Sequence, residues 1–246
     1  MAIDRDLVIR TALRLLDENG LEHLSLRRLA GELQVKAPAL YWYFESKRAL
    51  MDHMADAVLA PAVPELDGPA DPADWPAWLD HTASVLRARL LAHPDGAQLA
   101  LGVDLSRAPA LRRFVERTIE VLDGAGFGLA DASRAAATFI WFVVGRTVEE
   151  QSLPDQMRDR PEAVIPDGPA PASGSILARA MAERAAPDDQ EVSFRFGVRV
   201  MIAGMQALLR EATPGGGAPP GSGATPGSDI AASCHDLKLR GRMKPT

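Results

Sequence analysis

The sequence has little of several residue types, and each shortage narrows what the chain can be. Its 246 residues include one cysteine, Cys234, so an internal disulfide framework is excluded, which suits the reducing cytoplasm. Only 5% of the residues are aromatic and β-branched residues are sparse, whereas alanine and leucine are abundant. This mixture favours helices and argues against a large sheet.

The sequence also lacks recognisable targeting and membrane segments. The N-terminus interleaves charged with apolar residues, so it does not form the apolar stretch of a signal peptide. No apolar run approaches the roughly 20 residues that a membrane-spanning helix needs. Hydrophobic residues make up 47% and charged residues 24%, a balance typical of a globular chain with an ample core. We therefore expect a soluble, cytoplasmic protein that does not interact with membranes.

Motifs for catalysis and metal binding are poorly represented. The five histidines lack the spacing of metal ligands, and neither a GxSxG motif nor a phosphate-binding loop occurs. The stretch "GAGFG" at residues 124–128 follows a predicted helix, whereas a dinucleotide-binding loop follows a strand. Cys234, His235 and Asp236 are neighbours in a polar tail, and sequence neighbours of this kind do not make a catalytic triad. We predict no cofactor, no protein-bound metal and no enzymatic activity.

The spacing of apolar residues predicts an all-α chain. Four helices are expected in the first quarter, opening near Asp4, Ser25, Pro38 and Ser46. Further helices are predicted over residues 75–93, 97–101, 109–123, 131–152, 175–184 and 191–211. Residues 154–174 are rich in proline and are predicted to form a loop. Residues 213–246 have low complexity and are predicted to be a disordered tail.

Residues 25–44 have the pattern of a helix-turn-helix unit, two short helices around a tight turn. Leu40 and Phe44 are four residues apart, so they share one helix face and can pack inward. Tyr41, Trp42 and Tyr43 then lie on other faces, and such a surface favours aggregation unless a partner covers it. A core segment is the alternative interpretation, but the helical period prevents all four aromatic residues from pointing inward.

Charge adds a second indication in the same region. The net charge is -6, but residues 1–50 contain eight basic and seven acidic residues, so they carry +1 and the remainder carries -7. Lys47 and Arg48 fall in the first turn after Ser46, where free N–H groups and added cations favour phosphate. A pair of solvated charges is the alternative interpretation.

The stretch "LSLRRLAGELQVKAPALYWYFESKRALMDHMAD" resembles the DNA-binding region of the TetR family of transcription regulators nearly end to end. "LLAHPDGAQLALG", "GFGLADASRAAATFIWFVVGRTVEEQ" and "SFRFGVRVMIAGMQALL" resemble the core of its tetracycline-responsive members, so the resemblance covers about residues 4–211. It implies an N-terminal three-helix DNA-binding head with a helix-turn-helix over residues 1–46. A larger helical core for ligand binding and homodimerisation would occupy residues 47–212. The family commonly has glycine where this chain has Gln34, so the turn must tolerate a side chain at some strain.

The resemblance implies a double-stranded, palindromic DNA operator as partner and a repressor as the usual mode of action. The residues that would face base edges or adjoining sugars are Arg27, Lys36, Ala37, Pro38 and Ala39. Those that would hold phosphates and sugars are Tyr41, Trp42, Tyr43 and Lys47. This division fits the chemistry, since cationic side chains can donate to guanine and alanine methyl groups can contact thymine. The operator is expected to differ from that of tetracycline-responsive members, which have a Glu–Gln pair where this chain has Lys36 and Ala37.

The resemblance also implies a small-molecule effector held in the core. Tetracycline-responsive members bind a magnesium-chelated drug through a histidine at the position of Ala100, so a chelated tetracycline is not expected here. An apolar effector, aromatic or polyketide-like, is predicted instead. Its cavity would be lined by Thr82, Leu86, Ala100, Val103, Leu105, Leu111, Phe114, Trp141, Phe142 and Glu149. The alternative function is that of a helical small-molecule-binding protein, or an enzyme on this scaffold, without DNA binding.

Overall fold

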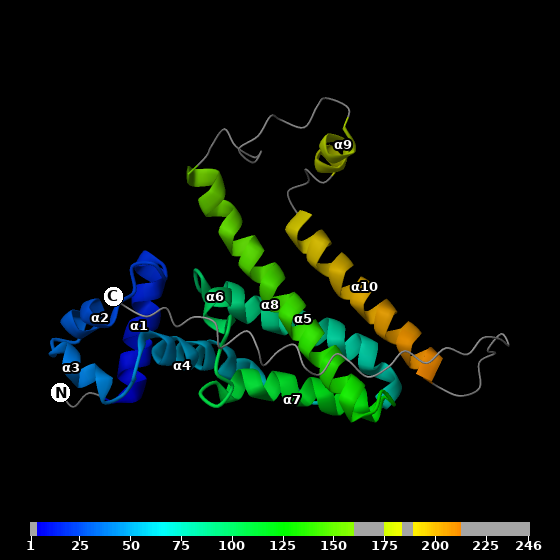
Figure 1. Cartoon of the computed structure of the whole chain (residues 1–246), viewed down its shortest axis with the longest axis horizontal. Helices are drawn as coiled ribbons and strands as arrows, with labels where there is room; N and C mark the ends of the chain where they lie inside the picture. Colours follow the sequence, from blue (N-terminus) through cyan, green and yellow to red (C-terminus); the bar gives the residue numbers. More distant parts are fainter. Residues whose placement is uncertain (1–3, 160–174, 184–188, 213–246) are drawn as a thin grey trace, which may run out of the picture. The chain divides into compact units, whose positions relative to one another are not determined.

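A computed structural model describes residues 4–159, 175–183 and 189–212, except for the side chains of residues 153–159, 181 and 182. All regular elements in these ranges are helices, as predicted (Figure 1). The first four are α1 (Arg5–Asn19), α2 (Leu26–Glu32), α3 (Ala37–Tyr41) and α4 (Lys47–Leu59). Two short 3₁₀ helices follow, η1 (Ala60–Glu65) and η2 (Pro72–Asp74). The remaining helices are α5 (Trp75–Leu91), α6 (Gly96–Ala100), α7 (Pro109–Gly124), α8 (Leu129–Asp159), α9 (Ile176–Glu183) and α10 (Asp189–Ala212).

The helices of the head begin where the sequence places capping residues. The Ser25 hydroxyl accepts the Arg28 N–H at 3.2 Å, and the Ser46 hydroxyl accepts the Ala49 N–H at 3.0 Å. Each bond satisfies one of the N–H groups that have no partner in the first helical turn. Pro38 lies in the first turn of α3, where its missing N–H costs nothing. These local signals fix the starts of α2, α3 and α4.

The turn between α2 and α3 contains a strained residue. Gln34 has a φ of 56°, in the left-handed region that favours glycine. The turn closes with the Gln34 N–H donating to the Gly31 carbonyl at 3.1 Å and the Val35 N–H donating to the Ala30 carbonyl at 2.9 Å. The chain thus places a side chain on a backbone that glycine adopts more readily, and the cost of this stays a prediction.

Two apolar clusters lie in the described part of the chain. The first joins α1 to α4 and includes Val8, Leu16, Leu29, Leu40, Phe44, Leu50 and Met54, together with Leu99 from α6. The second joins α5, α7, α8 and α10 and includes Leu79, Leu86, Leu111, Phe114, Phe139, Val143, Phe194 and Val198. Helix α4 packs against α1 and also against α5, α6 and α7. It therefore belongs to both clusters and connects the head to the core.

Helix α8 differs from the prediction at its C-terminal end. The sequence predicts a helix over 131–152 and a proline-rich loop from 154, whereas α8 continues through Pro154 to Asp159. Proline removes one backbone donor and crowds the preceding turn, which weakens a helix without always ending it. Residues 160–174 of the predicted loop and the predicted tail at 213–246 lie outside the described residues.

Helix α10 exposes an apolar face. Val192, Phe196, Val200 and Leu208 are all exposed. By length and composition only, this helix is apolar enough to cross a membrane. Only 17% of its most apolar window is buried within the chain, so it is not an ordinary core helix. Such a face is typical of a surface that a partner covers.

Candidate DNA-binding and effector sites

The aromatic run at the end of α3 is divided between the interior and the surface. Leu40 and Phe44 are buried in the head cluster. Tyr41 is 56% exposed and Trp42 is 90% exposed. The predicted division is therefore confirmed for Tyr41 and Trp42, whereas Tyr43 is half-buried against the head cluster. An almost fully exposed tryptophan contributes nothing to the fold, so its presence points to a partner.

Phe44, the buried last residue of this run, lies between a charged and a titratable side chain. The Arg5 guanidinium lies 5.6 Å from the centre of the Phe44 ring, and the His53 ring lies edge-on at 5.5 Å between ring centres. Arg5 Nη2 also donates to the Tyr43 carbonyl at 3.1 Å. Partial burial, with the nearby Arg5 charge, lowers the pKa of His53. The end of α3 is thus tied to the start of α1 and to α4.

The nine residues predicted to bind DNA lie on α2, on α3 with its flanking residues, and at the start of α4. None of them is fully buried. Arg27, Lys36 and Pro38 are exposed, whereas Ala37 and Ala39 are half-buried. Arginine, lysine and small apolar groups on a short helix suit readout of a major groove. The structure therefore leaves these side chains accessible to a duplex.

The two cations at the start of α4 point to different surroundings. Lys47 is exposed, and its ammonium group donates to the Leu21 carbonyl at 3.3 Å. Arg48 was predicted to face phosphate together with Lys47, but its guanidinium turns towards the core. Arg48 Nη1 donates to the Leu101 carbonyl at 2.8 Å, and Nη2 donates to the Leu99 carbonyl at 2.9 Å. The prediction for Arg48 is wrong, because the carbonyls of Leu99, in α6, and Leu101, directly after it, accept its hydrogen bonds.

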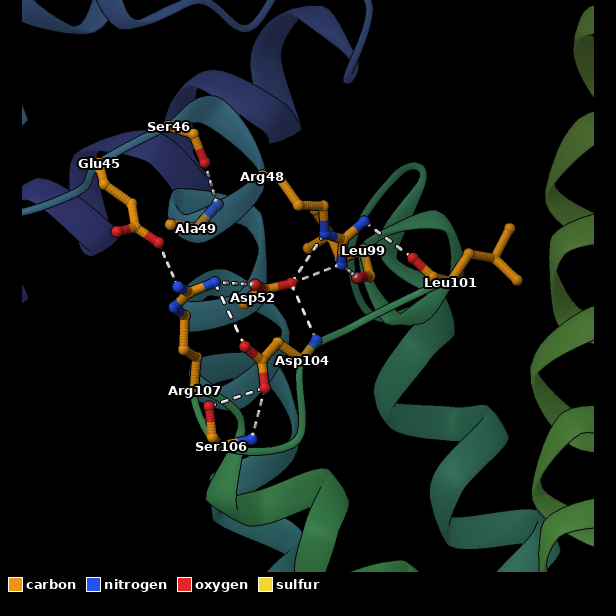
Figure 2. A network of polar contacts seen from close by, with 10 residues as sticks. All are labelled: Glu45, Ser46, Arg48, Ala49, Asp52, Leu99, Leu101, Asp104, Ser106 and Arg107. Atoms are coloured by element: carbon orange, nitrogen blue, oxygen red, sulfur yellow. Dashed lines mark hydrogen bonds and ion pairs between the residues drawn. The ribbon is translucent and has the colours of Figure 1, made fainter. Parts of the chain in front are cut away.

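A buried carboxylate lies at the centre of the contacts that connect α4 with the segment after α6 (Figure 2). Asp52 is fully buried, and its Oδ1 accepts the Arg48 Nε–H at 2.8 Å. The same oxygen accepts the Asp104 N–H at 3.4 Å. Asp52 Oδ2 makes no hydrogen bond to any described residue and lies 3.5 Å from Arg107 Nη1. A buried charge is stable only when opposite charges and donors surround it, so this group fixes α4 against residues 99–107.

The outer members of this network complete the connection. Arg107 also pairs with Glu45, at the end of the helix-turn-helix, and lies 3.4 Å from an Asp104 oxygen. Asp104 accepts hydrogen bonds from the N–H of Ser106 at 2.9 Å and from its hydroxyl at 2.7 Å, and these bonds lower the pKa of Asp104. Sequence reasoning missed this network. The spacing of Arg48 and Asp52, four residues apart on one helix, was the available signal.

The ten residues predicted to line the effector cavity do not form one enclosed set within a protomer. Five of them are buried in the core cluster, and Val103 is half-buried against both clusters. The five are Thr82, Leu86, Ala100, Leu111 and Phe114. Phe142 is half-buried and also packs against the core cluster. The remaining three, Leu105, Trp141 and Glu149, are exposed.

Phe142 and the three exposed residues have different surroundings. Leu105, Trp141 and Glu149 are exposed on the protomer, and Glu149 pairs with Arg146 at 2.8 Å. Phe142 packs against α10, where its ring stacks on Phe194 with 6.3 Å between ring centres. A Cβ atom at Gly197 would lie only 2.3 Å from the Phe142 ring, so α10 needs glycine at this contact. Phe142 therefore holds α8 to α10 within the chain.

Thr82 is unusual among the buried threonines of the core. The hydroxyl groups of Thr118 and Thr147 donate to carbonyls one turn earlier, at 2.7 Å and 2.8 Å. The Thr82 hydroxyl is also buried but makes no hydrogen bond in the described part of the chain. A buried polar group without a partner is costly, and its persistence calls for an explanation. Among the predicted effector residues, Thr82 is thus the one with an unused hydrogen-bonding group.

A half-buried arginine connects three core helices. Arg87 on α5 makes two hydrogen bonds to Glu150 on α8, at 2.9 and 2.8 Å, and pairs with Glu191 on α10. Its guanidinium also lies over the Phe194 ring at 4.8 Å. The hydrogen bonds to Glu150 and Glu191 raise the pKa of Arg87. The pKa of Glu191 is lowered, first by a hydrogen bond from Arg195 and then by that from Arg87. The cluster keeps α8 and α10 in fixed positions beside the candidate effector residues.

Three clefts on the described surface contain none of the ten predicted effector residues. The largest, of about 1320 Å³, lies between the α1–α2 turn and the α5–α6 turn. A second, of about 640 Å³, lies between α5 and α10, and a third, of about 490 Å³, lies between α8 and α10. Among the described residues, no three His, Cys, Asp or Glu side chains are grouped as metal ligands.

Two family models match the chain. The model of the bacterial regulatory proteins of the tetR family matches residues 8–54, and the tetracyclin repressor-like C-terminal domain matches residues 68–209. The tetracycline repressor protein class A from transposon 1721 of Escherichia coli is 37% identical over 203 residues, which cover 80% of this chain and 88% of that protein. The class C repressor of Escherichia coli is 39% identical over 160 residues, covering 65% and 72%.

Solved structures agree with these matches. A possible TetR family transcriptional regulator from Streptomyces coelicolor A3(2) is 33% identical, with a TM-score of 0.71 over 83% of this chain and all of that one. A TetR variant from Acinetobacter baumannii AYE in complex with minocycline is 31% identical, with a TM-score of 0.63 over 84% and 98%. BioQ with its natural double-stranded DNA operator is 29% identical, with a TM-score of 0.60 over 84% and 99%. The chain therefore belongs to the TetR family, as a ligand-responsive, DNA-binding transcriptional regulator.

Proposed function

We propose that a homodimer of this chain represses transcription in the cytoplasm by binding a palindromic operator, and that a small apolar effector releases it. Residues 1–46 act as the DNA-binding domain, and residues 47–212 act as the domain for effector binding and dimerisation. Two recognition helices must then meet successive major grooves, about 34–36 Å apart. The exposed apolar face of α10 supplies a surface for the partner protomer.

The exposure of Trp42 beside the buried Phe44 is the observation that carries the DNA-binding proposal. Arg27 and Lys36 contact base edges, with Ala37, Pro38 and Ala39 against bases and sugars. Tyr41, Trp42, Tyr43 and Lys47 contact phosphates and sugars. Contacts of the first kind specify the sequence, and contacts of the second kind supply affinity that falls as salt rises.

The buried residues of the core support the proposal for the effector. Leu86, Leu111 and Phe114 offer an apolar surface, and the unpartnered Thr82 hydroxyl offers one hydrogen bond. These features fit an apolar, aromatic molecule with one polar group. Because the residues are packed in the free protein, the effector must separate them as it enters. It thereby favours one conformation over another.

The route from this site to the head follows the segment after α6. Ala100 and Val103 come from the candidate site, and residues 99–107 hold the buried Asp52 on α4. A shift of this segment would move α4 and with it the angle of the head. Moving such a switch from 1:99 to 99:1 requires roughly 5.5 kcal/mol of difference in effector affinity between the two states.

Selection from a random pool of duplexes, followed by titration of the selected operator, tests DNA binding. A selected inverted repeat is expected. Trp42→Ala should weaken operator binding at least about tenfold without changing thermal unfolding, since this side chain is almost fully exposed. Lys47→Ala should lower the salt dependence by about one phosphate contact. The control is Arg112→Ala, which removes an exposed cation on α7, outside the DNA-binding domain. It should change neither operator affinity nor its salt dependence.

Two results would contradict this function. If no inverted repeat is selected, the chain is a helical small-molecule-binding protein without DNA binding. If a Tyr43→Ala, Lys47→Ala double variant binds the selected operator like the wild type at every salt concentration, the assigned docking face is wrong.

A further inference from the structure

We infer that Asp95 and Gln151 form a second tether between the core and the head, which positions the head on the operator. The contact itself joins two turns that are far apart in sequence. The Leu21 N–H, in the α1–α2 turn, donates to Asp95 Oδ2 at 2.8 Å. Gly20 has a φ of 74°, and a Cβ atom there would lie 3.3 Å from the same oxygen. The α1–α2 turn is thus shaped for close approach of this carboxylate.

Asp95 is held in an unusual conformation for this contact. It precedes α6 at the capping position, but its carboxylate makes no bond to the N–H groups of that helix. Its φ of 57° lies in the left-handed region, which is costly for a residue other than glycine. Its other oxygen, Oδ1, accepts a hydrogen bond from the side-chain amide of Gln98, Nε2, at 3.2 Å. A capping aspartate with its carboxylate turned away leaves the start of α6 without its usual acceptor.

Gln151 on α8 replaces the missing acceptor. Its Oε1 accepts the Ala97 N–H, in the first turn of α6, at 3.0 Å. Its Nε2 donates to the carbonyls of Leu90 at 3.1 Å and His93 at 2.8 Å. One side chain from α8 therefore closes the whole α5–α6 turn. This leaves the Asp95 carboxylate free to reach the head.

The tether connects α8 with the head without passing through α4. Glu150, next to Gln151, binds Arg87 on α5, which keeps this part of α8 in place. A second contact also joins the α5–α6 turn to the head, because the His93 ring lies 2.6 Å from an Asp17 oxygen on α1. Around these contacts lies the cleft of about 1320 Å³, so the α1–α2 turn has room to move if they are broken.

A tether from α8 has a particular consequence in a dimer, and this step rests on the function proposed above. Because α8 and α10 belong to the core shared by the two protomers, a head fixed to α8 is also fixed relative to the partner's head. Loss of the tether should leave each head able to bind DNA alone. It should make binding of both heads to one operator weaker, because fewer molecules have the correct spacing.

Asp95→Gly tests this, because glycine accepts the left-handed backbone and only the carboxylate is lost. Amide hydrogen exchange at residues 21–24 of the full chain should accelerate about tenfold or more, with the rest of the head unchanged. Affinity for the selected operator should fall about tenfold, whereas affinity for a duplex carrying one half-site should stay within about twofold. Gln151→Glu, which loses the two donated bonds but keeps an acceptor for Ala97, should act in the same direction with a smaller effect.

Asp71→Ala is the matched control, since Asp71 also accepts a backbone N–H at 2.8 Å, from Ala73 within the core. It should change neither exchange at residues 21–24 nor the ratio of the two affinities. Unchanged exchange in both tether variants would overturn the tether. Faster exchange with an equal loss for one and two half-sites would overturn its positioning role. A wild type that binds neither duplex would instead overturn the proposed operator function, and the positioning role with it.

Discussion

The head and the core display their functional chemistry in opposite ways. The head places it on the surface, where Trp42 is exposed beside the buried Phe44. The core buries five of its ten candidate effector residues, and two of these, Leu86 and Phe114, look like any other packed side chains. A protein that binds a polymer must keep apolar and cationic groups in water, which conflicts with the usual burial pattern and is visible in sequence. An apolar effector site follows the same pattern as a core and is not visible.

The junction between these regions differs from both, because it buries a charge. Asp52 is fully buried with Arg48 and Arg107, each about one-third exposed, beside it. Asp52→Ala should lower the free energy of unfolding by about 3 kcal/mol, since Arg48 and Arg107 both lose their ion pair with this carboxylate. Urea unfolding monitored by circular dichroism measures this loss.

Asp104→Ala is the control for the junction. Its carboxylate is exposed and contacts the same Arg107 at 3.4 Å, so its removal should cost less than about 1 kcal/mol. Equal losses in the two variants would show that burial of Asp52 adds nothing. The junction would then be no more than a surface ion-pair network, and the contrast with the exposed head would disappear.

Within the core, Thr82 distinguishes a binding site from ordinary packing. Thr82→Val removes a buried hydroxyl that lacks a partner, so it should stabilise the effector-free protein by roughly 1 kcal/mol. Thr118→Val removes a hydroxyl that donates to the Phe114 carbonyl, so it should destabilise by roughly 1 kcal/mol. Unfolding in urea gives both values. Changes of the same sign would mean that the Thr82 hydroxyl has a partner, and the core would lose its one marked effector contact.

Local chemistry made most of the fold predictable. Ser25 and Ser46 identify helix starts because capping depends on neighbours in sequence. Pro154 misled the prediction, since one proline weakens a helix without always ending it and α8 continues to Asp159. Arg48 also misled it, because the carbonyls that attract this side chain come from residues about fifty positions away. Contacts of that kind depend on the tertiary fold and leave no local pattern.

The two candidate sites differ in how far the sequence predicts them, for the same reason. The exposed members of the DNA-binding face follow from helical period alone, and the division of Leu40 from Trp42 is confirmed. The effector residues came from resemblance by position, which carries no information on side-chain direction. Trp141 and Phe142 are adjacent on α8, so one turns outward while the other packs on α10. Neither burial nor an unpartnered hydroxyl such as that of Thr82 can be deduced from a position in a motif.

A smaller effect is expected at the turn of the head. Gln34→Gly places glycine where φ is 56° and should stabilise the chain by roughly 0.5–1 kcal/mol, because relief of strain exceeds the added freedom of the unfolded chain. Gln34→Ala keeps the strain and should change stability by less than about 0.5 kcal/mol. Thermal unfolding of both variants tests the difference. If glycine gives no gain over alanine, the head tolerates this backbone without cost.

The smallest effect concerns His53, which lies between the exposed and buried sides of the head. Its pKa is lowered by burial and by Arg5, so the unfolded chain binds a proton more readily than the folded one. Stability is therefore complete above the ordinary histidine pKa of about 6.5 and falls as the pH drops from there towards the lowered value. Asp56 and Asp52 oppose the shift, which keeps the change small. Urea unfolding between about pH 5 and 7.5 should show a steeper acid loss in the wild type than in His53→Gln, and parallel curves would mean that His53 titrates alike in both states.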